Sequence, residues 1–390
     1  MAPAARTGAP GIDARARSRR RKRVVLVSAS LLAALLTVEG GLRFLLFSDL
    51  ARRSGLGWRA RNAALYTARE AGEESWRLKA LLQGPRAALP SPNYDARFGW
   101  LKPTIDAATL AHADEGLLAG RRPVLLFGDS YAECASAPCW QELLQASELS
   151  DRFCLLNYGV GGFGLDQMAM LLGPVLDRFA ERSPIVVIGI LVDDDLDRCD
   201  LGLRGFPKPH FTVRDDQLAL HPLEHADPQS YLRDHPLGIR SFAWRWLLFG
   251  SGLVPRELAL AWVGETGHVA RKEELNRLLL LAIRDELEAR DLTYFFLLFH
   301  ARRSLEAAGP HGWQEPFLYA TFPELGASFV SSKRFLRSFL ERTGTPVEHL
   351  YLPPGPGMNH YTSLANEVVF EALSDGLKGR FEPFEYLADR

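Results

Sequence analysis

Two residues that could carry acyl chemistry stand far apart in the sequence, each at the edge of a predicted element. Ser130 follows the apolar run at 124–127 in the stretch PVLLFGDSYAECAS, and His360 precedes the helix-like segment SLANEVVFEAL. A serine hydroxyl becomes a nucleophile when a neighbouring base takes its proton, and histidine is the most common base. If the fold brings the two side chains together, they can form an acyl-serine.

The same stretch has a second interpretation. Aspartate and serine are frequent N-cap residues, so Asp129 or Ser130 could serve only to start a helix. If a helix instead begins at or just after Ser130, its hydroxyl and its backbone N–H are presented where a strand ends. The spacing alone leaves both interpretations open.

From residue 123 onward, short β-rich runs alternate with helix-length segments, which predicts a parallel sheet with helices on both faces. Apolar stripes at helical spacing predict helices in GLDQMAMLLGPVLDRFAER, KEELNRLLLLAIRDELEARD and SKRFLRSFLERTG, the last closed by Gly344. FTVRDDQLALH predicts a hairpin. The predicted strands lie at 124–128, 154–159, 185–192, 294–299 and 347–352.

The N-terminal region predicts a membrane anchor. Seven basic residues between Arg15 and Arg23 precede an apolar run of fifteen residues, Val24 to Val38. Such a run reaches about 22 Å as a helix, less than the roughly 30 Å of a bilayer core. The span must therefore continue through 39–47, where Glu39 and Arg43 are four residues apart and can pair on one helix face.

The basic cluster should remain in the cytoplasm, which places the chain after about residue 50 outside. A cleaved signal peptide is the alternative, but no small-x-small cleavage site follows the run at the expected place. A basic arm that binds nucleic acid is a third interpretation, disfavoured by the adjacent apolar run and by a formal net charge of -1. We expect a single-pass protein of a bacterial inner membrane with its globular part on the periplasmic or extracellular side, and no nucleic-acid partner.

The cysteines fit an exported protein. Disulfides persist outside the cytoplasm, and the spacing of Cys134 and Cys139 suits a bridge across a small surface loop. Cys154 and Cys199 complete a set of four that allows three pairings, and free buried thiols remain an alternative. No metal-ligand spacing is present, so the sequence predicts no metal and no cofactor.

Four blocks in chain order resemble those of the SGNH (GDSL) hydrolases. They are GDS at 128–130, NYGVGG at 157–162, the acidic turn after IVVIGILV, and HYTSLAN at 360–366. The resemblance covers about residues 120 to 380. Just upstream, NYDARFGWLKP resembles the lead-in of membrane-anchored bacterial members, and PKPHFTVRDDQLAL resembles a hairpin that some of them carry.

The resemblance implies a flavodoxin-like three-layer α/β/α sandwich with a parallel sheet, and ester hydrolysis through an acyl-serine. Carried over to this chain, it makes Ser130 the nucleophile and His360 the general base. It assigns the oxyanion hole to the N–H groups of Ser130 and Gly162, with a third-block residue that is Asp193 or Asp194 by spacing.

Two positions depart from the family pattern. The third block usually offers an asparagine amide as oxyanion donor, whereas an ionised Asp193 or Asp194 cannot donate. The triad acid expected three residues before His360 is replaced by Gly357. A backbone carbonyl, Glu348 or the acidic turn must then orient the imidazole, or the two residues act as a Ser-His dyad.

The sequence thus predicts an α/β protein in four parts: a basic cytoplasmic segment (1–23), a transmembrane signal anchor (24–47), a stalk or linker (48–119) and a hydrolase domain (120–390) with an insertion or lid at about 200–270. The predicted function is a membrane-tethered serine esterase or O-acyltransferase acting on acyl (acetyl) esters of cell-surface glycans or lipids. Its partners are the acyl-ester substrate and the membrane. A catalytically degenerate binding or assembly module of the cell envelope is the competing hypothesis, and a purely structural anchor is the third.

Overall fold

The computed structural model describes residues 11–57, 60–84, 89–354 and 359–382. The chain divides into two compact units. Met1–Glu70 and Leu237–Gly264 form the anchor unit, and Ala71–Pro236 and Glu265–Arg390 form the sheet unit.

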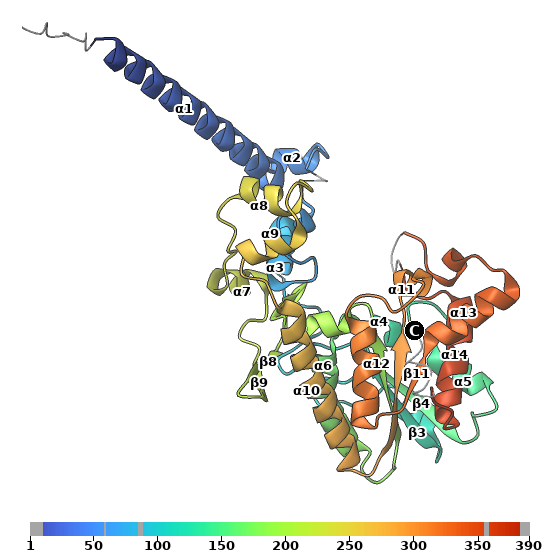
Figure 1. Ribbon diagram of the computed structural model, residues 1–390. Coiled ribbons are helices and arrows are strands. Elements are labelled where there is room, and N and C mark those ends of the chain that lie inside the picture. Colours follow the sequence, from blue (N-terminus) through green and yellow to red (C-terminus); the bar gives the residue numbers. More distant parts are fainter. Residues whose placement is uncertain (1–10, 58–59, 85–88, 355–358, 383–390) are drawn as a thin grey trace, which may run out of the picture. The chain divides into compact units, whose positions relative to one another are not determined.

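The sheet unit is built on five parallel strands in the order β11-β10-β5-β3-β4 (Figure 1). After β3 the chain moves outward to β4 and then returns to the other side of β3 to form β5. A ligand crevice is expected at the carboxyl ends of the strands where the winding direction reverses in this way. The strands span Arg122–Gly128 (β3), Phe153–Gly159 (β4), Ile185–Leu191 (β5), Thr293–Phe299 (β10) and Phe329–Ser331 (β11).

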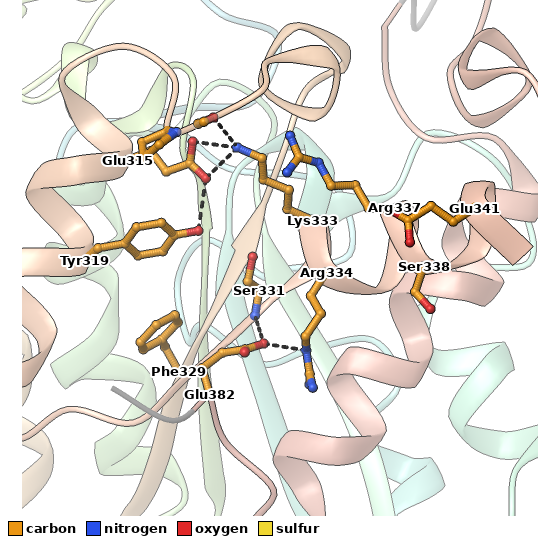
Figure 2. Close-up of a pocket in the computed structure, with 12 residues that line it drawn as sticks. Glu315, Tyr319, Phe329, Ser331, Lys333, Arg334, Arg337, Ser338, Glu341 and Glu382 are labelled. Atoms are coloured by element: carbon orange, nitrogen blue, oxygen red, sulfur yellow. Dashed lines mark hydrogen bonds and ion pairs between the residues drawn. The ribbon is translucent and has the colours of Figure 1, made fainter. Parts of the chain in front are cut away.

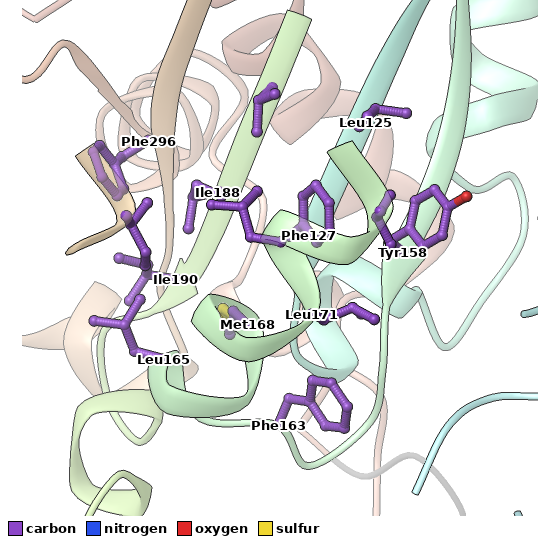
Figure 3. Packing of buried hydrophobic residues seen from close by; sticks show 14 of the residues in the cluster. Leu125, Phe127, Tyr158, Phe163, Leu165, Met168, Leu171, Ile188, Ile190 and Phe296 are labelled. Atoms are coloured by element: carbon purple, nitrogen blue, oxygen red, sulfur yellow. The ribbon is translucent and has the colours of Figure 1, made fainter. Parts of the chain in front are cut away.

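Helices cover both faces of the sheet because successive strand side chains point to opposite sides. Leu125 and Phe127 pack with α6 (Leu165–Arg178), α10 (His268–Glu288) and α12 (Gln314–Leu325). Figure 3 shows Phe127 near Met168 and Leu171 of α6. Val124 and Leu126 pack with the opposite layer. The predicted three-layer α/β/α fold with a parallel sheet is confirmed. The opposite layer consists of α5 (Trp140–Ala146), α13 (Ser332–Thr343) and α14 (Ser363–Leu377).

Four predicted strands are confirmed to within two residues at each end, and the fifth is wrong. Val347–Leu350 forms a 3-10 helix after Pro346, and Leu350 packs into the core from it. The fifth strand is instead β11, whose three residues are too few to show a period in the sequence.

The predicted hairpin and the three predicted helices are confirmed. β8 (His210–Arg214) and β9 (Gln217–His221) are joined through Asp215 and Asp216, whose φ angles of 51° and 58° fit a tight hairpin turn. Gly344 follows α13 with a φ of 67°, the left-handed conformation that ends many helices.

Residues upstream of β3 also enter the core of the sheet unit. Phe98, Trp100, Leu101, Ile105 and Leu118 are buried in the same cluster as α6 and α10. This region includes β1 (Tyr94–Asp95) and β2 (Gly99–Trp100), which pair antiparallel. The NYDARFGWLKP segment therefore packs on the domain that carries Ser130.

The anchor unit contains α1 (Gly11–Phe47), α2 (Asp49–Arg53), α8 (Phe242–Phe249) and α9 (Arg256–Trp262). Among the described residues, one helix is long and apolar enough to cross a membrane, namely the 29 residues Arg19–Phe47 of α1. This helix is consistent with an anchor and with a signal sequence. The predicted pairing of Glu39 with Arg43 is confirmed, with 2.6 Å between Oε1 and Nε.

Candidate active site

Ser130 lies at the carboxyl end of β3, as the first residue of α4 (Ser130–Glu133). Glycine is required at Gly128 because a Cβ there would lie 2.4 Å from the Cβ of Ala132. Asp129 is the N-cap of α4, since its carboxylate accepts the N–H of Tyr131 at 2.8 Å. Capping is thus the role of Asp129, and the hydroxyl of Ser130 is left for another partner.

That partner is His360. Its Nε2 lies 2.8 Å from the Oγ of Ser130, although the two residues are 230 positions apart. The same Oγ lies 3.2 Å from a carboxylate oxygen of Asp129. Both members of the pair are half-buried. The fold therefore brings together the two residues that the sequence selected as nucleophile and base.

Neighbouring backbone contacts fix His360 in this position. The hydroxyl of Tyr131 donates to the C=O of Asn359 at 2.6 Å, and the Tyr131 ring packs on the imidazole with 5.1 Å between ring centroids. The C=O of His360 accepts the N–H of Leu352 at 2.8 Å. Sequence reasoning missed Tyr131, although it stands directly after Ser130. Gly357 lies outside the described residues.

The loop after α4 links the two halves of this pair. It is closed by the Cys134–Cys139 disulfide, which confirms that predicted bridge, while Cys154 and Cys199 are buried free thiols. Within the loop, Ser136 donates from its hydroxyl to the C=O of Tyr361 at 2.9 Å. The bridge therefore stabilises a loop that connects the helix of Ser130 to the residue after His360.

Replacing both bridged cysteines is expected to lower the stability of the sheet unit. Opening a loop of this size removes a constraint on the unfolded chain worth about 2 kcal/mol. Cys134→Ser/Cys139→Ser should show this loss in urea unfolding. Reducing the bridge of the wild type should lower the free energy of unfolding by a similar amount, and an unchanged value in the double variant would contradict the prediction.

Gly162 lies on a loop that borders Ser130. A Cβ on the neighbouring Gly161 would be 3.8 Å from the Cβ of Ser130, and the C=O of Gly161 accepts the indole N–H of Trp100 at 2.9 Å. The N–H of Gly161 donates to Glu133 at 2.7 Å. Gly162 itself has a φ of 85°, which a residue with a side chain rarely adopts. The predicted oxyanion loop is thus held beside the serine.

The two acidic candidates for the third oxyanion position face other partners. Asp193 accepts the backbone N–H of Ala301 at 2.9 Å. Asp194 forms ion pairs with Arg198 and Arg204. Burial raises the pKa of Asp194, but the two guanidinium groups outweigh this effect and lower it to about 2. Asp194 is therefore ionised at neutral pH and cannot donate a hydrogen bond.

Sequence reasoning also missed two arginines behind the site. Arg198 is almost fully buried, and its Nη1 contacts the C=O of Phe163 at 2.6 Å, Asp195 at 2.8 Å and Asp129 at 3.3 Å. The positive charge of Arg198 thus compensates the negative charge of Asp129, which stands next to Ser130. The only signal in the sequence was an arginine that closes the acidic turn VDDDLDR.

Arg204 lies beside the oxyanion loop. Its Nη1 is 3.3 Å from the C=O of Gly162, and a Cβ on Gly162 would lie 2.6 Å from this nitrogen. The guanidinium also stacks over the ring of Trp76 at 5.3 Å and pairs with Asp194 at 3.3 Å. Burial and Arg198 lower the pKa of Arg204 to about 10, which leaves it charged at neutral pH. A hydrogen-bond donor with a positive charge therefore borders the loop of Gly162, which the sequence predicts to supply an oxyanion donor.

The carboxylates considered as orienting acids for His360 have other partners in the structure. Asp195 accepts the N–H of Leu191 at 2.8 Å in addition to its contact with Arg198. Glu348 lies 3.9 Å from Arg302 and is exposed. Asp193, Asp194, Asp195 and Glu348 therefore each contact a group other than His360.

A cavity of about 250 Å³ lies between α12, β11 and α13, and Ser130 and His360 do not line it (Figure 2). Lys333 binds Glu315 there at 2.9 Å, and Arg334 binds Glu382 at 2.9 Å. Burial raises the pKa of Glu315, but His300 and Lys333 outweigh it and lower it to about 2. Four charged groups of this cavity thus pair with one another, while Arg337 donates to the C=O of Leu305 at 3.3 Å. Among the described residues, no cluster of His, Cys, Asp and Glu is arranged to hold a metal ion.

No protein-family profile matches the sequence, and no curated protein matches it. Similar solved structures include the YxiM protein of Bacillus subtilis, at 10% identity over 66% of this chain and 57% of that chain, with a TM-score of 0.36. A lipase/acylhydrolase from Enterococcus faecalis matches at 12% identity over 67% of this chain and 98% of that chain, with a TM-score of 0.34. The acetylxylan esterase Axe2 from Geobacillus stearothermophilus matches at 12% identity over 67% and 95%, also with a TM-score of 0.34. The chain spans just over half the length of YxiM.

Proposed function

We propose that this chain is an exported, membrane-tethered serine esterase or O-acyltransferase of the SGNH/GDSL type. The observation that carries the proposal is the 2.8 Å contact between the Oγ of Ser130 and the Nε2 of His360 at the carboxyl edge of a parallel sheet. Acyl esters of cell-surface glycans or lipids are the proposed substrates, since an exported and anchored enzyme meets them at its own membrane.

In the proposed mechanism, Ser130 attacks the ester carbonyl while His360 accepts the hydroxyl proton. The carbonyl oxygen becomes an oxyanion, which the N–H groups of Ser130 and Gly162 stabilise. His360 then gives its proton to the leaving alcohol, and the acyl group remains on Ser130. Attack by water regenerates the serine and releases an acid, whereas attack by a sugar hydroxyl transfers the acyl group.

We assign the third oxyanion contact to the guanidinium of Arg204. The family pattern places an asparagine amide there, but here Asp194 is held as an anion by Arg198 and Arg204. Arg204 supplies the N–H donors that the carboxylate lacks, and its charge opposes that of the oxyanion. In this arrangement Asp194 positions Arg204 instead of contacting the substrate.

The competing proposal is a binding or assembly module that keeps the fold without catalysis. The ionised Asp194 favours it, because a carboxylate close to the reacting carbonyl would oppose the developing negative charge. The intact contact between Ser130 and His360 favours the enzyme.

Covalent labelling separates the two proposals. A fluorophosphonate reacts with a serine only when a base activates it, so we expect stoichiometric labelling of the full-length protein in detergent, mapped to Ser130 by mass spectrometry. His360→Ala should prevent labelling. A folded wild-type protein that takes up no label would exclude the proposed acyl-serine chemistry.

A further inference from the structure

The anchor unit exposes seven large apolar side chains on α2, α8, α9 and the segments that follow α2 and α8, which together are called the apolar surface of this unit. Trp262 on α9 is 63% exposed, and Leu253, between α8 and α9, is 78% exposed. Trp244 and Trp262 meet edge to face, with ring centroids 5.3 Å apart. Soluble surfaces rarely gather so many large apolar side chains. The exposed members are Leu50, Leu56, Trp244, Trp246, Leu253, Leu258 and Trp262.

This surface is attached to α1 through Glu39. The carboxylate of Glu39 accepts the backbone N–H groups of Phe242 at 3.2 Å and Ala243 at 2.9 Å, so it caps the N-terminus of α8. Arg43 pairs with Glu39 and donates to the C=O of Arg240 at 3.0 Å. Figure 1 shows α8 beside the C-terminal end of α1. The charges of Glu39 and Arg43 are thus satisfied within the protein.

The length of the apolar run determines the depth of α8. Val24 to Val38 supply about 22 Å of helix, and a bilayer core needs roughly 30 Å. Residues 39–47 must then lie in the outer part of the apolar layer, where a charged Glu39 is tolerated because α8 and Arg43 compensate it. Since α8 packs on these residues, it lies at the depth where tryptophan is favoured.

The charge of the anchor unit also fits a lipid surface. Residues 39–70 and 237–264 contain nine arginines and four acidic residues, although the whole chain has a formal net charge of -1. Arginines close to a bilayer attract anionic headgroups. The same segments therefore combine exposed tryptophans with a local positive charge.

We propose that α8, α9 and the segment between them lie in the headgroup region of the bilayer that α1 crosses, with Trp244, Trp246 and Trp262 inserted among the lipids. This inference rests on the membrane anchor that the proposed function includes. It does not depend on the proposed ester hydrolysis at Ser130. The insertion 237–264 is then a membrane-docking element that adds a second contact to the single span. The alternative partner for this surface is a second copy of the chain.

Fluorescence quenching tests the proposal. The full-length protein is reconstituted into vesicles of phosphatidylcholine and phosphatidylglycerol, with or without lipids brominated close to the headgroup. Three of the eight tryptophans would contact the brominated lipid, so roughly three-eighths of the emission should be quenched if all eight emit equally. Trp244→Phe/Trp246→Phe/Trp262→Phe should lose most of this quenching, whereas Trp313→Phe in the sheet unit should retain it.

Two results would overturn the proposal. One is equal quenching of the wild type and the triple variant. The other is an absence of quenching in protein that is bound to the vesicles. If such protein also forms a cross-linked dimer, the apolar surface binds a second copy of the chain. Ester hydrolysis measured on the same vesicles reports separately on the proposed chemistry. Phenylalanine keeps the apolar surface, so loss of quenching in the triple variant reports the position of the removed indoles and not unfolding.

Discussion

Ser130→Ala is expected to lower kcat/KM for a short-chain p-nitrophenyl ester by at least about 10³-fold, because the nucleophile of the acyl-serine is removed. His360→Ala should cause a similar loss, since an unassisted serine hydroxyl is a weak nucleophile. The double variant should be no slower than either single variant, because both residues act on the same step. Release of p-nitrophenolate by the full-length protein in detergent gives the rate.

The matched control is Ser150→Ala. Ser150 precedes β4 and so lies at the amino end of the strands, opposite the edge that carries Ser130. Its replacement should leave the rate unchanged. If Ser130→Ala hydrolyses the ester as fast as the wild type, Ser130 is not the nucleophile, and the binding-module proposal is then preferred.

Arg204→Met is expected to lower kcat by about 10²-fold or more with a small change in KM, because an oxyanion donor acts mainly in the transition state. Arg204→Lys keeps a positive charge and one donor group, and it should recover part of the rate. Initial rates over a range of ester concentrations separate kcat from KM.

Arg182→Met is the control for loss of an arginine. Arg182 is exposed and precedes β5 at the amino end of the sheet, so its removal should not change either parameter. A purely structural role for Arg204 would lower the unfolding temperature without the split between kcat and KM. Wild-type kcat in a folded Arg204→Met variant would remove Arg204 from the mechanism.

The local patterns in the sequence determined most of the sheet unit. Buried parallel strands are continuous apolar runs, and α6, α10 and α13 carry stripes at helical spacing, so both could be recognised without tertiary information. Positions at strand and helix ends also selected Ser130 and His360. The wrong prediction at 347–352 has the same basis, because a segment of only six residues does not distinguish a strand from a helical turn.

Sequence alone left open whether the region before β3 packs on the domain. Trp100 lies in the core, where its indole N–H donates to the C=O of Gly161, and this contact joins residues 61 positions apart. No local pattern reports such a partner.

What the sequence determined by itself was the type of fold and the identity of a serine and a histidine that could react. Only the tertiary structure decided that their side chains meet, that Asp194 is paired with Arg198 and Arg204, and that Glu39 caps α8. The physical reason is that periodicity and capping act between neighbours in the chain, whereas a charge or hydroxyl takes its state from groups brought near it by folding.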